Sequence, residues 1–120
     1  MIKISPRNKK LIEKNALAFA TSDNSSKPNV IGVAYIKVVS KNQILITDNF
    51  MKQTKDNLKH NPHVCLAVWD KNWSGIKLIG KARYFTEGKW KEAVRKMPEN
   101  KGLSAKGAIL VTVSKLIELR

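Results

Sequence analysis

Apolar runs divide the chain into short strand-like segments separated by polar turns. Residues 29–40 are rich in β-branched side chains, which favours a strand, and residues 76–85 alternate so that one face carries Leu78 and Ala82 and the other Lys77 and Lys81. Gly80 in the middle of that alternation predicts a bend or a close backbone approach. The pattern predicts six strands, over 16–21, 29–40, 43–47, 63–69, 76–85 and 108–113.

Helical spacing marks three shorter segments. The pattern predicts helices over 6–15, inside 48–62 and over 87–97, where Trp90 lies on an apolar stripe and is expected to pack rather than to contact a cofactor. Residues 98–106, with Gly102, are predicted to form a loop. Because most strands are joined by tight turns, we expect a mainly β fold, a six-stranded antiparallel barrel with short α-helices, in a single domain spanning 1–120.

The segment 48–62 joins two strands and carries the clearest candidate chemistry. Asp48 and Asn49 are helix N-cap types, and Pro62 ends the helix. The first turn of such a helix exposes unpaired N–H groups, and the neighbouring ammonium, amide and hydroxyl groups complete the donor set that a phosphate requires. These side chains belong to Lys52, Gln53 and Thr54. The alternative is a capped surface connector, since the segment has no P-loop pattern.

The formal net charge of +14 raises the possibility of a nucleic-acid partner. The cations are spread along the chain, and 19 of the 23 are Lys rather than the Arg that reads bases best. We therefore expect a basic surface that favours anionic ligands and argue against nucleic acid as the main partner. A small basic nucleic-acid-binding barrel stays open as an alternative, with aromatic side chains that could stack on bases, although core packing is their ordinary explanation. These aromatics are Trp69, Trp73, Tyr84 and Phe85.

Other kinds of chemistry have little support. Cys65 is the only cysteine and is predicted to be a buried, inert thiol, while His60 and His63 straddle Pro62 and lack a third ligand, so we expect no metal site. The sequence shows no catalytic motif, and we predict no catalytic residue: a cofactor must bring any chemistry. No apolar run is long enough to cross a membrane and the N-terminus lacks a secretory segment, so a soluble, cytoplasmic protein is expected.

The order of elements resembles a known family. The segments 35–38, 43–47, 51–58, 61–62, 64–68 and 76–82, taken in succession, resemble the FMN-binding split barrel of the pyridoxamine 5'-phosphate oxidase-like superfamily, and most of all its small FMN-binding proteins. The resemblance covers nearly all 120 residues. It implies a homodimer with one FMN per subunit near the interface, and an unidentified small-molecule or protein redox partner.

The resemblance also implies roles for individual residues. The FMN phosphate would be bound by Lys52, Gln53 and Thr54. The ribityl chain and the ring edge would be lined by Thr47, Asp48, Asn49 and Phe50. Backbone groups for the polar edge of the isoalloxazine would come from Val30, Ile31, Gly32 and Val33, and the glycine would allow close approach of the ring.

Two departures from the family matter. Relatives commonly carry Lys where this chain has Gln53 or Thr54, so the phosphate charge would be met by Lys52 or Lys55. The chain lacks the C-terminal extension of true pyridoxamine-phosphate oxidases, which argues against that reaction, and we hypothesise that residues 116–119 pack on a partner subunit. Three functions follow: an FMN-dependent electron carrier or oxidoreductase, a flavin storage or sensing module without turnover, and the basic barrel. F420 and haem, which occur in the wider superfamily, stay open as cofactors.

Overall fold

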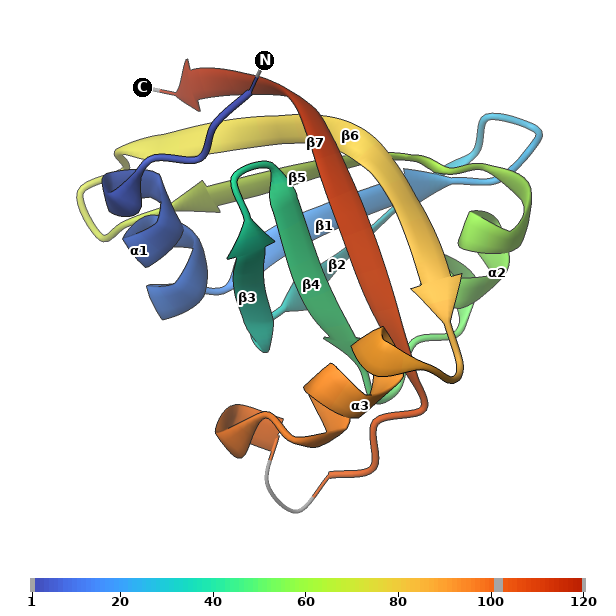
Figure 1. The fold of residues 1–120 in the computed structure, drawn as a ribbon. Coiled ribbons are helices and arrows are strands. Elements are labelled where there is room, and N and C mark those ends of the chain that lie inside the picture. The colour runs from blue at the N-terminus through green and yellow to red at the C-terminus, as the bar shows by residue number, and fades with distance from the viewer. Residues whose placement is uncertain (1, 101–102, 120) are drawn as a thin grey trace.

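One antiparallel sheet forms the body of the molecule (Figure 1). The computed structural model describes residues 2–100 and 103–119. The strands lie in the order β2-β1-β5-β6-β7-β4-β3. The elements are α1 (Pro6–Lys14), β1 (Leu17–Ser22), β2 (Pro28–Val33), β3 (Ile36–Ser40), β4 (Gln43–Asp48), α2 (Gln53–His60), β5 (His63–Trp69), β6 (Gly75–Phe85), α3 (Lys89–Arg95), the 3₁₀ turn η1 (Pro98–Asn100) and β7 (Gly107–Leu119).

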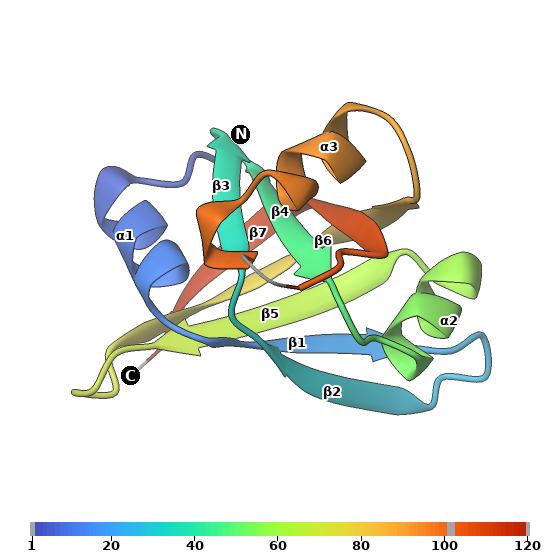
Figure 2. The same ribbon diagram turned by 90° about the horizontal axis from the view of Figure 1, so that it is seen from below.

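The antiparallel barrel is confirmed, but over residues 2–100 and 103–119 it has seven strands rather than six. The predicted strand 29–40 is two strands, β2 and β3, joined by Ala34 and Tyr35. These strands lie at opposite edges of the sheet, so the chain crosses from one edge to the other within two residues and the sheet curls into an open, or split, barrel (Figure 2). β-branched composition extends through both strands, so local propensity could not show the break.

The last strand is also longer than predicted. β7 runs to Leu119, and its end pairs with the start of β6, where Leu116 lies opposite Leu78. Leu116 packs against the core of its own subunit. Deleting residues 116–119 would therefore remove part of the subunit's own sheet, so such a deletion does not test the hypothesis that they pack on a partner. Gly102, in the predicted loop, lies outside the described residues.

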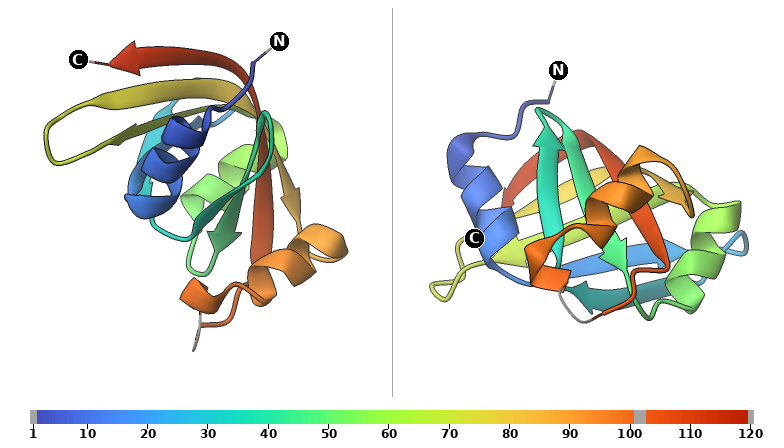
Figure 3. Two further views of the ribbon diagram at one scale, coloured as in Figure 1. Left: turned by 60° about the vertical axis from the view of Figure 1, so that its left-hand side comes forward. Right: turned by 60° about the horizontal axis from the view of Figure 1, so that its bottom comes forward.

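Apolar side chains fill both sides of the sheet around β4 and β7. The barrel interior holds the larger cluster, centred on Phe19, Leu66 and Leu78, and a second cluster lies under α3, where Val94 is buried. Trp90 packs at the edge of that second cluster, as predicted. β4 is therefore apolar on both faces, because the barrel interior covers one face and α3 covers the other (Figure 3).

Helix α1 lies against β3 and β5 (Figure 3). Its start follows the sequence signal closely, since the Ser5 hydroxyl accepts a hydrogen bond from Asn8 N at 3.1 Å and Pro6 occupies the first turn. Ile12 is the fully buried residue of this helix and packs in the barrel core. On the same helix, the Glu13 carboxylate accepts a hydrogen bond from Val38 N at 2.8 Å, so a helix side chain occupies one backbone donor of the edge strand β3.

Gly80 marks an irregularity between β6 and β7. The register shifts between Ile79 and Gly80, and a Cβ added at Gly80 would lie 2.2 Å from Thr112 O. The close backbone approach predicted for this glycine is confirmed.

Candidate functional site

A pocket of about 310 Å³ lies where β4 ends, α2 begins and β2 passes by. Its volume is at the low end of the range for small-molecule sites. Seven of the predicted site residues line it together with Met51, which the sequence analysis did not select. These seven are Ile31, Thr47, Asn49, Phe50, Lys52, Gln53 and Thr54. The structure thus brings residues from two distant segments, around 31 and around 50, to one cavity.

Helix α2 begins later than the N-cap types predicted. It starts at Gln53, its N-cap is Lys52, and no side chain caps it. Asp48 does not cap the helix: its carboxylate accepts a hydrogen bond from Met51 N at 2.7 Å, within the turn that precedes it. The first N–H groups of α2 are therefore left without a side-chain acceptor at the pocket, the arrangement that favours an anion.

The buried side of α2 is polar. Thr54 Oγ1 accepts a hydrogen bond from Asn29 Nδ2 at 3.1 Å, and Asn57 Nδ2 donates to Thr21 Oγ1 at 2.9 Å. Gln53 Nε2 donates to Asn57 Oδ1 at 2.7 Å. These bonds fix the helix start against β1 and β2, and the Thr54 hydroxyl still has its hydrogen to donate.

Asp48 lies beneath the pocket rather than on its wall, so the expectation that it lines the site is wrong in this structure. Its side chain is fully buried; Tyr84 Oη donates to Oδ2 at 2.5 Å, and Lys106 Nζ lies 4.0 Å from Oδ1. Lys106 Nζ also donates to the Met51 carbonyl. Burial raises the pKa of the Tyr84 hydroxyl far above its usual value, and the hydrogen bond to Asp48 and the charge of that carboxylate raise it further. The hydroxyl therefore keeps its proton and remains a donor. Residues far apart in sequence thus hold the 48–51 turn in place.

The other wall of the pocket is tied to the α3–η1 segment. Thr47 Oγ1 donates to Met97 Sδ at 3.3 Å, and Asn49 Nδ2 donates to Asn100 Oδ1 at 2.7 Å. The buried Asn49 Oδ1 has no hydrogen-bond partner within residues 2–100 and 103–119. Unpaired buried acceptors are uncommon, so this oxygen suits a donor from a ligand or an ordered water.

The predicted residues of β2 are distributed differently. Val30 is 63% exposed and Gly32 is exposed, whereas the Val33 side chain is buried in the core. Only Ile31 of the four lines the pocket. Because β2 is an edge strand, its outer backbone groups are not paired with a neighbouring strand. They remain available for the predicted contacts to a ring system, which stay a prediction.

The cations near the site differ in position. Lys52 lines the pocket and is exposed, while the Lys55 ammonium lies over the Tyr84 ring, 5.4 Å from its centroid. Of the two candidates to meet a phosphate charge, the geometry favours Lys52.

A metal site finds no support in the described part of the chain. Over residues 2–100 and 103–119 no three His, Cys, Asp or Glu side chains gather as a metal would require. His60 and His63 are both exposed. Cys65 is half-buried rather than buried, so that prediction is wrong, because its side chain points to the outer face of β5. None of the helices that the structure describes is long and apolar enough to cross a membrane.

Comparison with known proteins places this geometry in context. A family model described as pyridoxamine 5'-phosphate oxidase matches residues 5–119. The uncharacterized protein MJ0282 of Methanocaldococcus jannaschii is 27% identical over 124 residues, which cover all of this chain and 83% of that protein.

Solved structures share the fold at lower sequence identity. HupZ of Group A Streptococcus is 24% identical with a TM-score of 0.89, over 97% of this chain and 94% of that one. An FMN-binding protein from Syntrophomonas wolfei is 18% identical with a TM-score of 0.78, over 93% and 83%. HutZ, the heme storage protein of Vibrio cholerae, is 17% identical with a TM-score of 0.71, over 98% and 96%. The fold is therefore shared by proteins that bind different cofactors.

Proposed function

Because the chain belongs to the pyridoxamine 5'-phosphate oxidase family, we propose that it is a flavoprotein that binds FMN in the pocket at the start of α2. The observation that carries the proposal is the helix start without a side-chain cap, beside Lys52, Gln53 and the buried Thr54. This donor set fits a phosphate monoester, because it combines backbone N–H groups, a cation, an amide and a hydroxyl.

The rest of the pocket fits the non-phosphate part of the cofactor. Thr47 and Asn49 line the pocket, and the buried Asn49 Oδ1, which has no hydrogen-bond partner among the described residues, is an acceptor that a nearby ribityl hydroxyl would suit. The ring system would extend past the small pocket, over Phe50 and along the edge of β2. Phe50 is 77% exposed, so a planar apolar group would cover surface that water now contacts.

The residues of the pocket bind and orient rather than transfer protons. Its lining holds no His, Cys or carboxylate. When bound, the flavin supplies the redox chemistry, and the protein supplies binding, orientation and electrostatics. The function we propose is therefore an FMN-dependent electron carrier or oxidoreductase; steady turnover with NADH or NADPH would distinguish it from a flavin storage or sensing module.

The direct test is the visible absorption spectrum of the purified protein, with mass spectrometry of what denaturation releases. Flavin bands and the mass of FMN support the proposal. If denaturation released F420 or haem, that molecule would be the cofactor in place of FMN. A colourless protein that takes up none of the three would overturn the flavoprotein proposal.

The phosphate site can be tested by removing two donors. Lys52→Ala combined with Thr54→Ala is expected to weaken FMN binding by about 1–3 kcal/mol for each lost hydrogen bond. Titration of the apoprotein, followed by flavin fluorescence, measures the change. Lys59→Ala, at the far end of α2, is the matched control and should leave the affinity unchanged. Because Thr54 is buried, urea unfolding of each variant must show a folded protein; equal affinity in a folded double variant would move the phosphate elsewhere.

We also propose a homodimer that covers the pocket mouth. Phe50 lines a pocket too small to enclose a flavin ring, and Val30, on the outward face of the adjoining strand β2, is a second exposed apolar side chain, so a second subunit packed on this surface would complete the site. Val30→Glu is expected to shift the protein from dimer to monomer in light scattering after size exclusion. Asn24→Glu adds the same charge in the exposed β1–β2 turn and should not change the mass. A wild-type monomer, or a Val30→Glu dimer, would contradict this arrangement.

A further inference from the structure

Two tryptophans form an exposed stack at the β5–β6 hairpin, at the opposite end of the molecule from α2 (Figure 2). The rings of Trp69 and Trp73 are parallel within 13° with centroids 6.0 Å apart. Trp69 is 41% exposed and Trp73 is 71% exposed, so the expectation that they pack in the core is wrong for both. Their mutual stack leaves aromatic surface open to solvent, which can accept another planar group.

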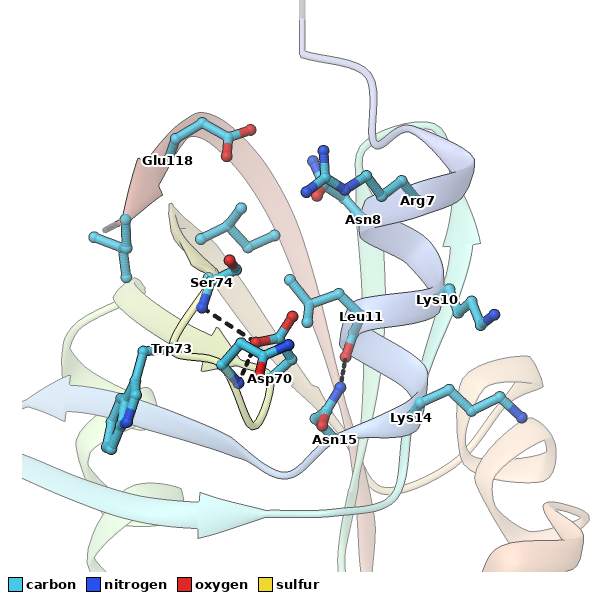
Figure 4. Close-up of a pocket in the computed structure, with 14 residues that line it drawn as sticks. Arg7, Asn8, Lys10, Leu11, Lys14, Asn15, Asp70, Trp73, Ser74 and Glu118 are labelled. Carbon is cyan, nitrogen blue, oxygen red and sulfur yellow. Dashed lines mark hydrogen bonds between the residues drawn. The ribbon is translucent and has the colours of Figure 1, made fainter.

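The hairpin faces helix α1 across a groove of about 820 Å³ (Figure 4). Arg7, Lys10 and Lys14 border the groove along α1, with the ends of Lys10 and Lys14 pointing away from it toward solvent, and Trp73 borders it on the hairpin. Leu11 and Ile76 give the groove an apolar part. The surface around the groove therefore combines cations along α1, apolar residues and an exposed aromatic group.

The balance of charge around α1 favours an anionic occupant. Residues 3–14 contain one carboxylate, Glu13, which is bonded to Val38 N. Across the groove, Asp70 Oδ1 is occupied by two backbone N–H groups of its own turn, and Glu118 is the remaining acidic residue of the lining. The cations of the same segment are Lys3, Arg7, Lys9, Lys10 and Lys14, and all five are exposed.

We propose that this surface binds single-stranded nucleic acid, with phosphates along α1 and bases on the Trp69–Trp73 stack. Cations that follow a backbone, combined with aromatic groups that stack on bases, are the two components of sequence-tolerant single-strand binding. A purely electrostatic partner would not need the exposed stack, and an apolar partner would not need the cations. The site is separate from the FMN pocket, and the proposal stands whether or not FMN is the cofactor.

The test uses the full-length protein, with any cofactor it retains, and a red-fluorescent oligodeoxythymidine of about 16 nucleotides followed by anisotropy. Trp73→Ala is expected to weaken binding roughly 5- to 150-fold, the effect of losing one base stack. Trp90→Phe, which changes an indole of α3 at the edge of the second apolar cluster, is the matched control and should bind as wild type.

A charge pair separates a local site from general attraction. The slope of log affinity against log salt concentration is negative, and Lys10→Glu with Lys14→Glu should make it shallower by about 1.4, at roughly 0.7 per lost phosphate contact. Lys89→Glu with Lys91→Glu makes the same change in charge on α3 and should change this slope by less. Equal losses in the two double variants, or no binding by the wild type at low salt, would overturn the proposal. So would a Trp73→Ala variant that dissociates a dimer while binding the oligonucleotide normally, since the stack would then be a subunit contact.

Discussion

Asp48→Ala is expected to lower the free energy of unfolding by about 2–6 kcal/mol. The substitution leaves two donors, Met51 N–H and the Tyr84 hydroxyl, without their acceptor, and each stranded donor costs about 1–3 kcal/mol. The loss is a large part of the total stability of a typical domain, about 5–15 kcal/mol. Urea unfolding measures it, as a lower midpoint with an unchanged slope.

A matched variant shows whether burial causes the effect. Glu87→Ala also removes a carboxylate, but from an exposed position, and should change stability by less than about 0.5 kcal/mol. Tyr84→Phe keeps the bond to Met51 N but leaves the buried Asp48 Oδ2 without its donor, so it should also lower the free energy of unfolding, by about 1–3 kcal/mol. If Asp48→Ala unfolded like the wild type, the carboxylate would not be the buried centre of this turn.

Gly80→Val is expected to destabilise the fold by at least about 3 kcal/mol or to prevent soluble expression. Its Cβ would lie 2.2 Å from Thr112 O, and that neighbour is backbone held in the β6–β7 ladder, so it cannot rotate away as a side chain would. The two strands would have to separate at the register shift, which combines overpacking with the loss of ladder hydrogen bonds. Thermal or urea unfolding of the purified variant gives the cost.

Another glycine provides the control for Gly80. A Cβ at Gly32 would meet nothing closer than Leu17 O at 4.0 Å, so Gly32→Ala should keep the stability of the wild type within about 0.5 kcal/mol. Similar losses in both variants would point to a general cost of replacing glycine in a strand rather than to the close approach at Gly80.

Sequence signals predicted the features of the fold that depend on residues close together in the chain. The α1 start at Ser5 and Pro6, the end of α2 before Pro62 and the close approach at Gly80 all follow from rules that act within a few residues. The residues around 31 and 50 came together as the family resemblance implied, although their binding of FMN stays a prediction.

Features that depend on distant partners could not be predicted in the same way. Asp48 looked like an N-cap because that role is local, whereas its burial depends on Tyr84 and Lys106, which come from other parts of the chain. Trp69 and Trp73 are large aromatic residues of the kind that usually packs in a core. They are exposed because they lie at the end of the β5–β6 hairpin. The division of 29–40 likewise depends on which edge of the sheet each half joins.

The bond from Glu13 to Val38 N bears on how this protein avoids aggregation. An open sheet has two edges, and each can recruit a strand from another molecule, the first step toward fibrils. On the β3 edge, the Glu13 carboxylate occupies a backbone donor that such a strand would need. The β2 edge begins with Pro28, which has no N–H to offer, but its remaining backbone groups stay open beside the pocket. Of the two edges, the one beside the proposed cofactor site has no such side-chain bond among the described residues, so loss of the cofactor would uncover a surface able to start self-association.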